Sequence, residues 1–408
     1  MKHSMMPLAA FLGFYLGLAS AELVQSGSIC TVTPLGGSSD DTPQIKKAFS
    51  QCSKDSQIIF QEGTYNIRQV MEFTNLKNVS IDIYGKWVWS ADNLQYWISN
   101  TLPVTYAGLH TGWKLGGTDI ALRGHGKALF DGNGQAWIDE NRGGSNRKGR
   151  PINLTIWRAT NVFVDGITWR QSQFWHTFVA YSKNVTMTNL DMRTRSNSQW
   201  SAVNTDGIDT WNSEDVTIRN WTVECYDDCI SIKGNSKNII AQNITCYESG
   251  CAVIGSIANG ATETVDNVLF QDFKCNHSSN AAWIKTYPGQ GHVRNVTFRN
   301  FEFSDVDQPI YVTSCIYSNQ NCDSSRLPIE DITWENVKGT SRWNVAAGMH
   351  CSSAAPCKGF KFKDVDIRPK AGGTAKVLCS NIKGQADMGL ACTGTCPAGW
   401  PQQLKGNR

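Results

Sequence analysis

Two carboxylate-bearing segments stand close together in a chain that is otherwise poor in charge. Only 18% of the 408 residues are Asp, Glu, Lys or Arg, yet Asp206 lies in NTDGID and, 21 residues later, Asp227 and Asp228 lie in YDDC. Crowded carboxylates raise the pKa of at least one member, which gives a protonated acid beside an ionised base. Hydrolysis of a glycosidic bond requires such a pair, whereas clustered carboxylates also suit a calcium ion. The residue types alone leave both uses open.

A seven-residue pattern recurs along the chain and gives this spacing a meaning. It begins with Asn, Asp or Gly and continues with alternating apolar residues, as in NVTMTNL from Asn184 and DVTIRNW from Asp215. From Asn161 onward, successive starts are 23, 31, 23, 29, 28, 36 and 28 residues apart. Each unit has the alternation of a short strand between turns, and repeats of roughly 20 to 50 residues indicate a solenoid. We therefore predict an all-β, single-domain parallel β-helix of about ten coils, with the recurrent Asn at its corners.

The 21-residue spacing is close to one coil, so Asp206 is expected to stack on Asp227 and Asp228. Neighbouring strands are about 4.8 Å apart, which crowds the three carboxylates on one patch of the outer surface. Trp283 and Lys285 follow on later coils and extend the line of polar and aromatic groups. A single Asp at a turn is more often a structural cap. Three converging carboxylates, in contrast, predict a functional groove.

The N-terminus has the features of a secretory signal peptide, which we place at residues 1–21. Lys2 precedes an apolar run from Leu8 to Leu18, and the small residues ASA end at Ala21. Such a run is too short to span a bilayer, and no later segment approaches the length of a membrane span. We therefore expect residues 22–408 to form a secreted, extracellular catalytic domain that does not associate with a membrane.

All fourteen cysteines follow the signal peptide, as in a chain that folds in an oxidising compartment. Up to seven disulfides are expected, and the close pairs Cys351/Cys357 and Cys392/Cys396 would close local loops. Zinc is the competing use of cysteine, but no CxxC is combined here with a second CxxC or an HxxxH. We therefore expect no metal.

The remaining composition bears on partners. A net charge of +3 lacks the basic stripe of a nucleic-acid-binding protein, so no nucleic-acid partner is expected. N-x-S/T sequons, which accept N-glycans in secreted proteins, are present at seven positions. These positions are Asn78, Asn153, Asn184, Asn220, Asn243, Asn276 and Asn295.

Several segments resemble the polygalacturonase family of glycoside hydrolases (family 28), which cleave pectin, and the resemblance extends over nearly all of the mature chain. NTDGID and DDCISIK match the NTDG and DDC motifs at the family's spacing. DGNGQAWID resembles the family's DGxGxxWW, IGS matches the end of its glycine-rich third motif, and WIK stands where the family has Arg-Ile-Lys. These segments are Asn204 to Asp209, Asp227 to Lys233, Asp131 to Asp139, Ile254 to Ser256 and Trp283 to Lys285. The resemblance implies a right-handed parallel β-helix and a monomer.

The resemblance also implies roles for individual residues. Asp227 resembles the general acid that protonates the leaving oxygen, and Asp206 and Asp228 resemble the pair that activates the attacking water. The implied reaction inverts the anomeric configuration in one displacement and uses no cofactor. Lys285 matches a substrate-binding lysine that faces a sugar carboxylate, and Tyr317 falls where the family often has a groove-lining tyrosine.

Two departures from the family pattern bear on specificity. Gly250 occupies the position of the family's histidine, and Trp283 occupies that of its arginine. An indole favours stacking on the apolar face of a sugar over recognition of a carboxylate. The loss of the histidine also resembles the rhamnogalacturonan-degrading branch of the family, and a tryptophan would suit rhamnose, which has a methyl group and no carboxylate. The resemblance further implies a disulfide between Cys229 and Cys246 beside the site.

The segment FWH, from Phe174 to His176, resembles the exo-acting members of the family. His176 is a candidate substrate contact, although a structural hydrogen bond is an equally good interpretation. Long early loops, at residues 95–100 and 141–150, would close one end of the groove. A closed end restricts an enzyme to chain termini.

The resulting hypothesis is a pectin hydrolase that releases terminal α-linked galacturonate, as a galacturan 1,4-alpha-galacturonidase or exopolygalacturonase does. Its partner would be a pectic polysaccharide or oligosaccharide. The main alternative is an exo-hydrolase of rhamnogalacturonan that releases terminal α-L-rhamnose. Two remote alternatives are a calcium-dependent pectate lyase, against which NTD and DDC argue, and a non-catalytic β-helix binding module, against which the three aspartates argue.

Overall fold

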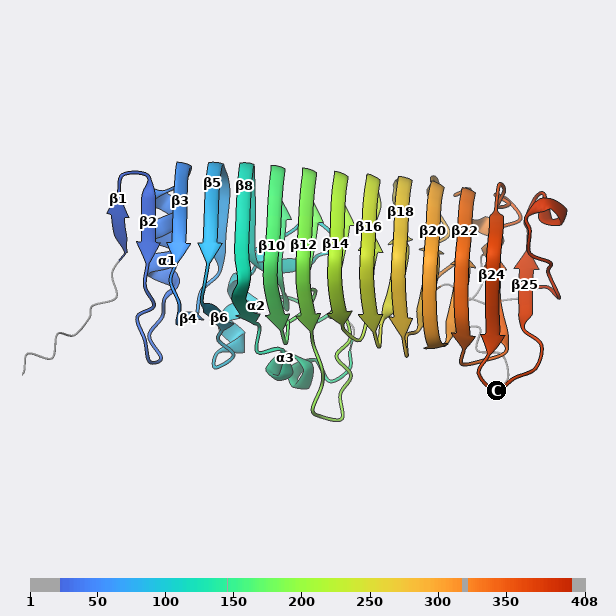
Figure 1. The fold of residues 1–408 in the computed structure, drawn as a ribbon, viewed down its shortest axis with the longest axis horizontal. Helices are drawn as coiled ribbons and strands as arrows, with labels where there is room; N and C mark the ends of the chain where they lie inside the picture. Colours follow the sequence, from blue (N-terminus) through green and yellow to red (C-terminus); the bar gives the residue numbers. More distant parts are fainter. Residues whose placement is uncertain (1–22, 145, 318–321, 398–408) are drawn as a thin grey trace, which may run out of the picture.

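A computed structural model describes residues 23–144, 146–317 and 322–397, and the predicted signal peptide lies outside this part of the chain. Parallel strands are stacked side by side along the whole length of the molecule (Figure 1). Helices account for 8% of the structure, and the prediction of an all-β, right-handed parallel β-helix is confirmed. In the described chain no helix combines the length and apolar character needed to cross a membrane.

Successive coils contribute strands to two rows. The long-strand row consists of β2 (Ile29–Val32), β3 (Lys54–Phe60), β5 (Met71–Ile83), β8 (His110–Asp131), β10 (Thr160–Arg170), β12 (Lys183–Arg193), β14 (Glu214–Glu224), β16 (Ser236–Tyr247), β18 (Thr262–Asn276), β20 (Gln290–Val306), β22 (Ile329–Ser341) and β24 (Lys361–Pro369). The short-strand row consists of β4 (Thr64–Ile67), β6 (Lys86–Trp89), β9 (Pro151–Trp157), β11 (Thr177–Ala180), β13 (Ile208–Trp211), β15 (Asp228–Ile232), β17 (Gly250–Ile257), β19 (Asn280–Thr286), β21 (Gln308–Thr313), β23 (Val345–His350) and β25 (Lys376–Ser380). The longest strand, β8, pairs with members of both rows.

The remaining elements lie at one end of the stack or in its loops. The short strands β1 (Val24–Ser26) and β7 (Leu102–Pro103) pair in antiparallel fashion. The helices are α1 (Thr42–Gln51), α2 (Leu94–Asn100) and α3 (Gly134–Asn141), and the 3-10 turns are η1 (Cys322–Ser324) and η2 (Gln385–Asp387). α1 buries Ile45 and Phe49 at the N-terminal end of the stack, where it contacts β2. α2, α3 and the loop after β12 lie at one edge of the stack (Figure 1).

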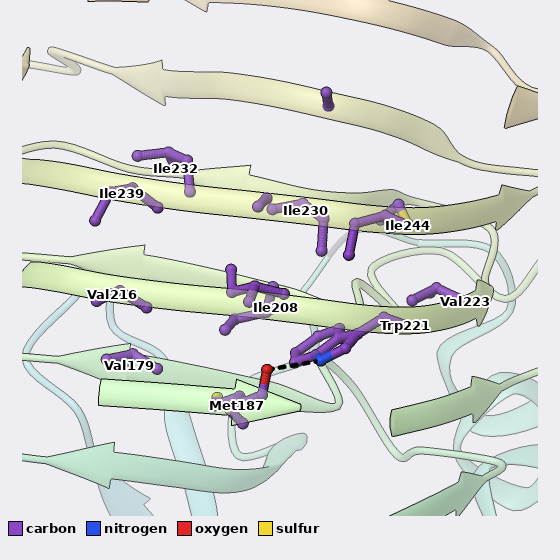
Figure 2. Packing of buried hydrophobic residues seen from close by; sticks show 14 of the residues in the cluster. Val179, Met187, Ile208, Val216, Trp221, Val223, Ile230, Ile232, Ile239 and Ile244 are labelled. Atoms are coloured by element: carbon purple, nitrogen blue, oxygen red, sulfur yellow. Dashed lines mark hydrogen bonds between the residues drawn. The ribbon is translucent and has the colours of Figure 1, made fainter. Parts of the chain in front are cut away.

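The core fills the space between the two rows. Along each strand alternate residues point inward, so that Ile208 is in register with Ile230, and Val216 with Ile239. Figure 2 shows these side chains in layers, with the indole nitrogen of Trp221 donating to the carbonyl of the preceding coil at 3.1 Å. Each fully buried isoleucine or valine contributes about 1.5–3 kcal/mol. The outer face of the same strands is thereby left free to carry polar groups.

Asparagines at the corners bond to one another from coil to coil. Asn184 has a φ of +54°, and its Nδ2 donates to Oδ1 of Asn161 at 2.9 Å. Asn243 and Asn220 repeat this pair at a second corner, again at 2.9 Å. Asparagine tolerates this left-handed backbone better than most residues do, and its amide satisfies both neighbours. The prediction of corner asparagines is confirmed.

Six disulfides are present in the described chain. The predicted pairs Cys351–Cys357 and Cys229–Cys246 are both formed. The remaining disulfides are Cys30–Cys52, Cys251–Cys275, Cys315–Cys322 and Cys379–Cys392.

The expected Cys392/Cys396 pair is wrong. Cys392 pairs with Cys379 of β25, because the final segment folds back along that strand. Cys396 is a free, buried thiol, as is Cys225. The seventh disulfide, expected as an upper limit, is therefore not formed between these two thiols.

Candidate active site

The three sequence-predicted carboxylates meet at the N-terminal ends of β13 and β15. Asp206 ends the loop before β13, and Asp228 begins β15. The backbone amide of Gly207 donates to the Asp228 carbonyl at 2.9 Å, which fixes the two segments on adjacent coils. A Cβ at Gly207 would lie 2.4 Å from the carbonyl oxygen of Cys229, so only glycine permits this approach. The Gly of NTDG is thus required by packing.

The carboxylates form a compact cluster. One oxygen from each of Asp206, Asp227 and Asp228 lies within 4.8 Å of the others. Asp227 accepts hydrogen bonds from the backbone amides of Asn204 at 2.9 Å and Asp228 at 3.0 Å. Asp206 is 2% exposed, and its Oδ1 has no hydrogen-bond partner among the described residues. The cluster therefore holds Asp227 by two amides and leaves one oxygen of Asp206 free to bind water or substrate.

Burial and mutual repulsion shift the protonation of this cluster. Burial raises the pKa of Asp206 well above its ordinary value, and the charges of Asp227, Asp209 and Asp228 raise it further. Burial and the charge of Asp228 raise the pKa of Asp227, while Lys285 and the Asn204 amide oppose the rise. A cluster of this kind retains a proton under conditions in which an isolated aspartate is ionised.

Lys285 is the cation beside the cluster. Its Nζ donates to Asp228 Oδ2 at 2.8 Å and lies 3.8 Å from the centroid of the Trp283 ring. The indole of Trp283 stacks on Tyr311 with the ring centroids 5.7 Å apart. A Cβ at Gly250 would lie 2.7 Å from Asp228 Oδ1, so a larger residue here would crowd that carboxylate. Trp283 therefore contacts the Lys285 ammonium through the face of its ring.

A cavity of about 480 Å³ opens over the carboxylates. Its wall toward the N-terminal coils is the segment 105–109, in which Tyr106 packs at 5.0 Å from Trp211 and 6.1 Å from Trp175 between ring centroids. On the other side it is bounded by Lys285 and Tyr317. The complete lining is Thr105, Tyr106, Ala107, Leu109, Asn146, Trp175, Asn204, Asp206, Trp211, Asp227, Asp228, Lys233, Ser256, Asn259, Ala261, Glu263, Lys285, Tyr287 and Tyr317.

The structure brings most of the sequence-predicted site residues to this cavity. Asp206, Asp227, Asp228, Lys285 and Tyr317 all line it. Two predicted residues do not. Trp283 contacts Lys285 but is not among the residues that line the cavity. The imidazole of His176 is fully buried, and its nitrogens lie 2.9 Å from the Asp206 carbonyl and 3.0 Å from Thr194 Oγ1.

The position of His176 matches the structural interpretation, since it lies behind the carboxylates. Burial lowers its pKa to about 4, which keeps the ring neutral at ordinary pH. Its backbone amide also donates to the Asp206 carbonyl, at 2.8 Å. His176 thereby anchors the backbone of Asp206.

A second polar group at the closed end of the cavity was missed by sequence reasoning. Lys233 Nζ forms an ion pair with Asp209 at 3.0 Å and donates to the Gly255 carbonyl at 2.9 Å. Glu263 accepts hydrogen bonds from Trp211 Nε1 at 3.1 Å and from the Ala258 amide at 2.7 Å. We call Asp209, Lys233 and Glu263 the closed-end group, because they lie beside the aromatic wall formed by Trp175 and Trp211.

One part of the closed-end group had a detectable signal in the sequence. Asp209 and Lys233 stand inside the two matched motifs, NTDGID and DDCISIK, at a spacing of about one coil. Glu263 had none, because it reaches the cavity from β18 of the long-strand row. The closed-end group adds one uncompensated carboxylate to the cavity.

The three clustered carboxylates are also the group in the described chain best placed to hold a metal ion at the cavity. Their oxygens are the ligands that calcium prefers. The Lys285 ammonium, however, already occupies one face of Asp228 at 2.8 Å and would repel a second cation. The donor set fits proton transfer better than cation binding.

Comparison with known proteins agrees with this arrangement. A sequence profile described as "Glycosyl hydrolases family 28" matches residues 113–392. The chain is 34% identical over 392 residues to "Alpha-L-rhamnosidase rgxB" of Aspergillus niger, covering 90% of each chain. It is 33% identical over 396 residues to "Exopolygalacturonase" of Cochliobolus carbonum, covering 91% of this chain and 87% of the relative. Among solved structures, an endo-xylogalacturonan hydrolase from Aspergillus tubingensis superposes with a TM-score of 0.81 at 28% identity, covering 90% and 99% of the two chains.

Proposed function

Because the chain belongs to glycosyl hydrolase family 28, we propose that its cavity performs exo-acting hydrolysis of pectic polysaccharides, with terminal galacturonate as the released sugar. The proposal depends mainly on one observation. Asp206, Asp227 and Asp228 converge in a cavity that the segment 105–109 bounds on one side. A terminal sugar residue fits a cavity of about 480 Å³. The rest of the polymer would extend past Lys285 and Tyr317.

In this mechanism Asp227 is the general acid. Burial and the charge of Asp228 raise its pKa, so it retains a proton at a higher pH than an isolated aspartate does. That proton passes to the glycosidic oxygen as the bond to the anomeric carbon breaks. Asp206 and Asp228 orient a water molecule and accept its proton as the water oxygen bonds to the anomeric carbon. One bond forms and one breaks in a single displacement, with inversion of configuration.

The distance between the carboxylates bears on whether the reaction inverts or retains the anomeric configuration. Inverting glycosidases commonly separate their two carboxyl groups by about 6.5–9.5 Å. The closest oxygens here lie within 4.8 Å. The proposal of inversion therefore rests on the resemblance to the family, and the short distance argues the other way. Proton NMR of the first-formed product anomer separates the two outcomes.

Exo action is supported by the closed end of the cavity. The segment 105–109 and Asn146 wall off the side toward the N-terminal coils. The aromatic rings of Tyr106, Trp175 and Trp211 pack together there, so the wall is held by more than one flexible loop. A polymer cannot pass through this side. Only its terminal residue reaches the carboxylates.

Lys285 lines the cavity, and its ammonium suits the carboxylate of galacturonate as the released sugar. The relative named exopolygalacturonase also favours galacturonate. Rhamnose is the second candidate because of the charges that line the cavity. Both lysines of the cavity are already paired, Lys285 with Asp228 and Lys233 with Asp209, while Glu263 adds an anion. With both lysines paired and one further carboxylate present, the charges of the cavity favour a neutral terminal sugar. The relative named alpha-L-rhamnosidase supports the same reading.

The test supplies oligogalacturonate and rhamnogalacturonan oligomers that end in either sugar, and identifies the first monosaccharide released. Galacturonate supports the first candidate, and rhamnose alone supports the second. Asp227→Asn is the control and should lower the rate by about 100-fold to 10,000-fold. Random internal cleavage, or no release by a folded protein, would contradict exo hydrolysis.

The cellular setting is proposed on the same basis. Residues 1–21 would be removed as a signal peptide, and residues 22–408 would act outside the cell as one catalytic domain and as a monomer. The six disulfides fit an oxidising compartment. Among the sequons, Asn153 is fully buried and bonded to Gln173, so a glycan there is incompatible with the fold. Asn276 is partly exposed, and its side chain takes no part in the corner ladders.

A further inference from the structure

Trp283 stands where the family has an arginine, and the mechanism above gives it no role. It belongs to β19 and does not line the cavity. Its ring centroid lies 3.8 Å from Nζ of Lys285. On the next coil, in register with Trp283, the ring of Tyr311 stacks on the indole with 5.7 Å between centroids and 17° between planes. The indole therefore contacts an ammonium group and a second aromatic ring.

The indole is held in this position by packing from the C-terminal coils. Tyr311 is 1% exposed and forms a small apolar cluster with Val345 of β23 and Cys396 of the final segment. Trp283 and Leu378 pack against this cluster. A closely packed interior leaves a large ring little freedom to turn without losing contacts on one side. The face of the indole is therefore a fixed surface for Lys285.

Lys285 needs such a surface because its side chain is long and flexible. Its backbone is fixed, since Lys285 is in register with Gly255 and a Cβ there would lie 2.0 Å from the Lys285 carbonyl oxygen. Its four-carbon side chain, however, loses much rotamer freedom when it is ordered. The ion pair with Asp228 at 2.8 Å offsets part of this loss. The Lys285 side chain is 5% exposed, so its contact with the indole is desolvated and contributes a comparable amount.

Gly250 leaves the space that this arrangement requires. It is in register with Asp228 on the preceding coil. A Cβ at Gly250 would lie 2.7 Å from Asp228 Oδ1 and 3.6 Å from Cε3 of Trp283. Even alanine would therefore press on the carboxylate, and a longer side chain would also have to displace the indole. The glycine and the tryptophan thus depend on each other, which links the two departures from the family pattern.

We propose that Trp283 is a positioning residue, whose ring face holds the Lys285 ammonium against Asp228 in the orientation that activates water. The indole acts through Lys285 and does not touch the sugar, because it lies outside the cavity lining. This role differs from the stacking on a sugar that the residue type alone indicates. The proposal rests on the hydrolytic function given above.

The first test separates kcat from KM for release of the terminal sugar. Trp283→Leu should lower kcat by about tenfold and change KM by less than about twofold, because a misplaced reacting group costs rate rather than substrate affinity. Trp283→Phe keeps a ring face and should retain kcat within about threefold of the wild type. Phe298→Leu is the matched control and should leave both constants unchanged. Phe298 is likewise a ring stacked between coils, on Phe270 and Trp334, but it packs in the core from β20.

Three results of this test would overturn the proposal. A rise in KM at unchanged kcat would mean that Trp283 contacts the sugar itself. An equal fall of kcat in Trp283→Phe and Trp283→Leu would mean that the shape of the indole matters and its ring face does not. Unchanged constants in Trp283→Leu would mean that Asp228 alone holds Lys285.

The second test needs no activity, so it distinguishes failure of this proposal from failure of the proposed function. Urea unfolding is measured for Trp283→Leu in the wild type and in Lys285→Met. The substitution should raise the unfolding equilibrium constant about fivefold more in the wild type, because only there does it remove the contact with the ammonium. Phe298→Leu should have equal effects in the two backgrounds.

Equal effects of Trp283→Leu in both backgrounds would assign Trp283 to packing alone and overturn the proposal. If Trp283→Leu does not fold, Trp283→Phe takes its place in the same measurement. The difference between backgrounds should then be smaller and of the same sign, because tryptophan is the stronger partner for a cation. No difference between backgrounds would again overturn the proposal.

Discussion

The two lysines of the cavity occupy similar surroundings but face different tasks. Lys285 pairs with Asp228, which belongs to the cluster of three carboxylates, and lines the cavity together with Tyr317. Lys233 pairs with Asp209, which is fully buried and does not line the cavity, at the closed end. In the proposed mechanism, the same type of ion pair therefore adjusts a reacting carboxylate on one side. On the other side, the ion pair of Lys233 and Asp209 stabilises the wall of the cavity, where Lys233 contacts Trp175.

The largest expected difference between the two sides is in catalysis. Asp228→Asn should lower kcat/KM by about 1,000-fold, because it removes a group that activates water. Asp209→Asn removes an equally buried aspartate with its own lysine, and should cost about tenfold through displacement of Lys233. Both are measured as kcat/KM for release of the terminal sugar. Equal losses would show that the two sides share one catalytic task.

The stability of the two lysine variants should differ in the opposite sense. Lys233→Met leaves Asp209 buried and unpaired, which costs about 3–5 kcal/mol. Lys285→Met leaves Asp228 unpaired at a cavity where water can reach it, so the loss should be smaller. Urea unfolding measures both. A more stable Lys233→Met than Lys285→Met would mean that Asp209 is protonated in the native state and needs no cation.

Selectivity should depend on the closed-end group. Glu263→Gln keeps the hydrogen bond from Trp211 but removes the anion beside the terminal sugar. The ratio of galacturonate to rhamnose release should rise by about tenfold, which corresponds to about 1.4 kcal/mol. Asp266→Asn is the control, since Asp266 is on the same strand but pairs with Arg294 and His292 away from the cavity. An unchanged ratio in Glu263→Gln would remove Glu263 from sugar recognition.

The two rows of strands differ in how much of their contribution to the cavity can be predicted from the sequence. The repeat of Asn-initiated strands predicts the solenoid, because each coil obeys the same alternation and the same corner geometry. The register then places Asp206 against Asp227 and Asp228, since their spacing is one coil. Lys285 is predicted because its motif, WIK, lies on the short-strand row as well. These inferences depend only on periodicity within one row of strands.

Features that depend on contacts between rows or loops could not be predicted in this way. Glu263 enters the cavity from the long-strand row, and Tyr106 enters it from a loop with no repeat. Trp283 has the right register for the groove, yet its indole stacks on Tyr311 and contacts Lys285 and does not line the cavity. Register gives the face of the sheet on which a side chain lies. It does not give the direction in which a long side chain turns.

The smallest expected effect is on the pH dependence of stability. Asp206 and Asp227 have folded-state pKa values above those of the unfolded chain, so they bind more protons when folded. Their contribution is fully present below about pH 4, the unfolded pKa, and is lost as the pH rises through the folded pKa values. Glu214 and Asp305 have lowered pKa values of about 2, so their contribution is lost as the pH falls through that value. The contribution of the two carboxylates should therefore be greatest below about pH 4 and decline toward neutrality. His176 acts in the opposite sense between about pH 4 and pH 6.5, because burial lowers its pKa to about 4 and the unfolded chain binds the additional proton.

Differential scanning calorimetry from pH 3 to pH 8 measures this curve, and a double variant isolates the cluster. Asp206→Asn combined with Asp227→Asn should flatten the decline above pH 4, because neither amide titrates. The closed-end pair of Lys233 and Asp209 remains intact in that variant, so any residual decline reports on Asp209, whose pKa burial raises and Lys233 opposes. A difference in Tm between the wild type and this double variant that does not fall between pH 4 and pH 7 would contradict the raised pKa values. It would also remove the protonated acid on which the proposed hydrolysis depends.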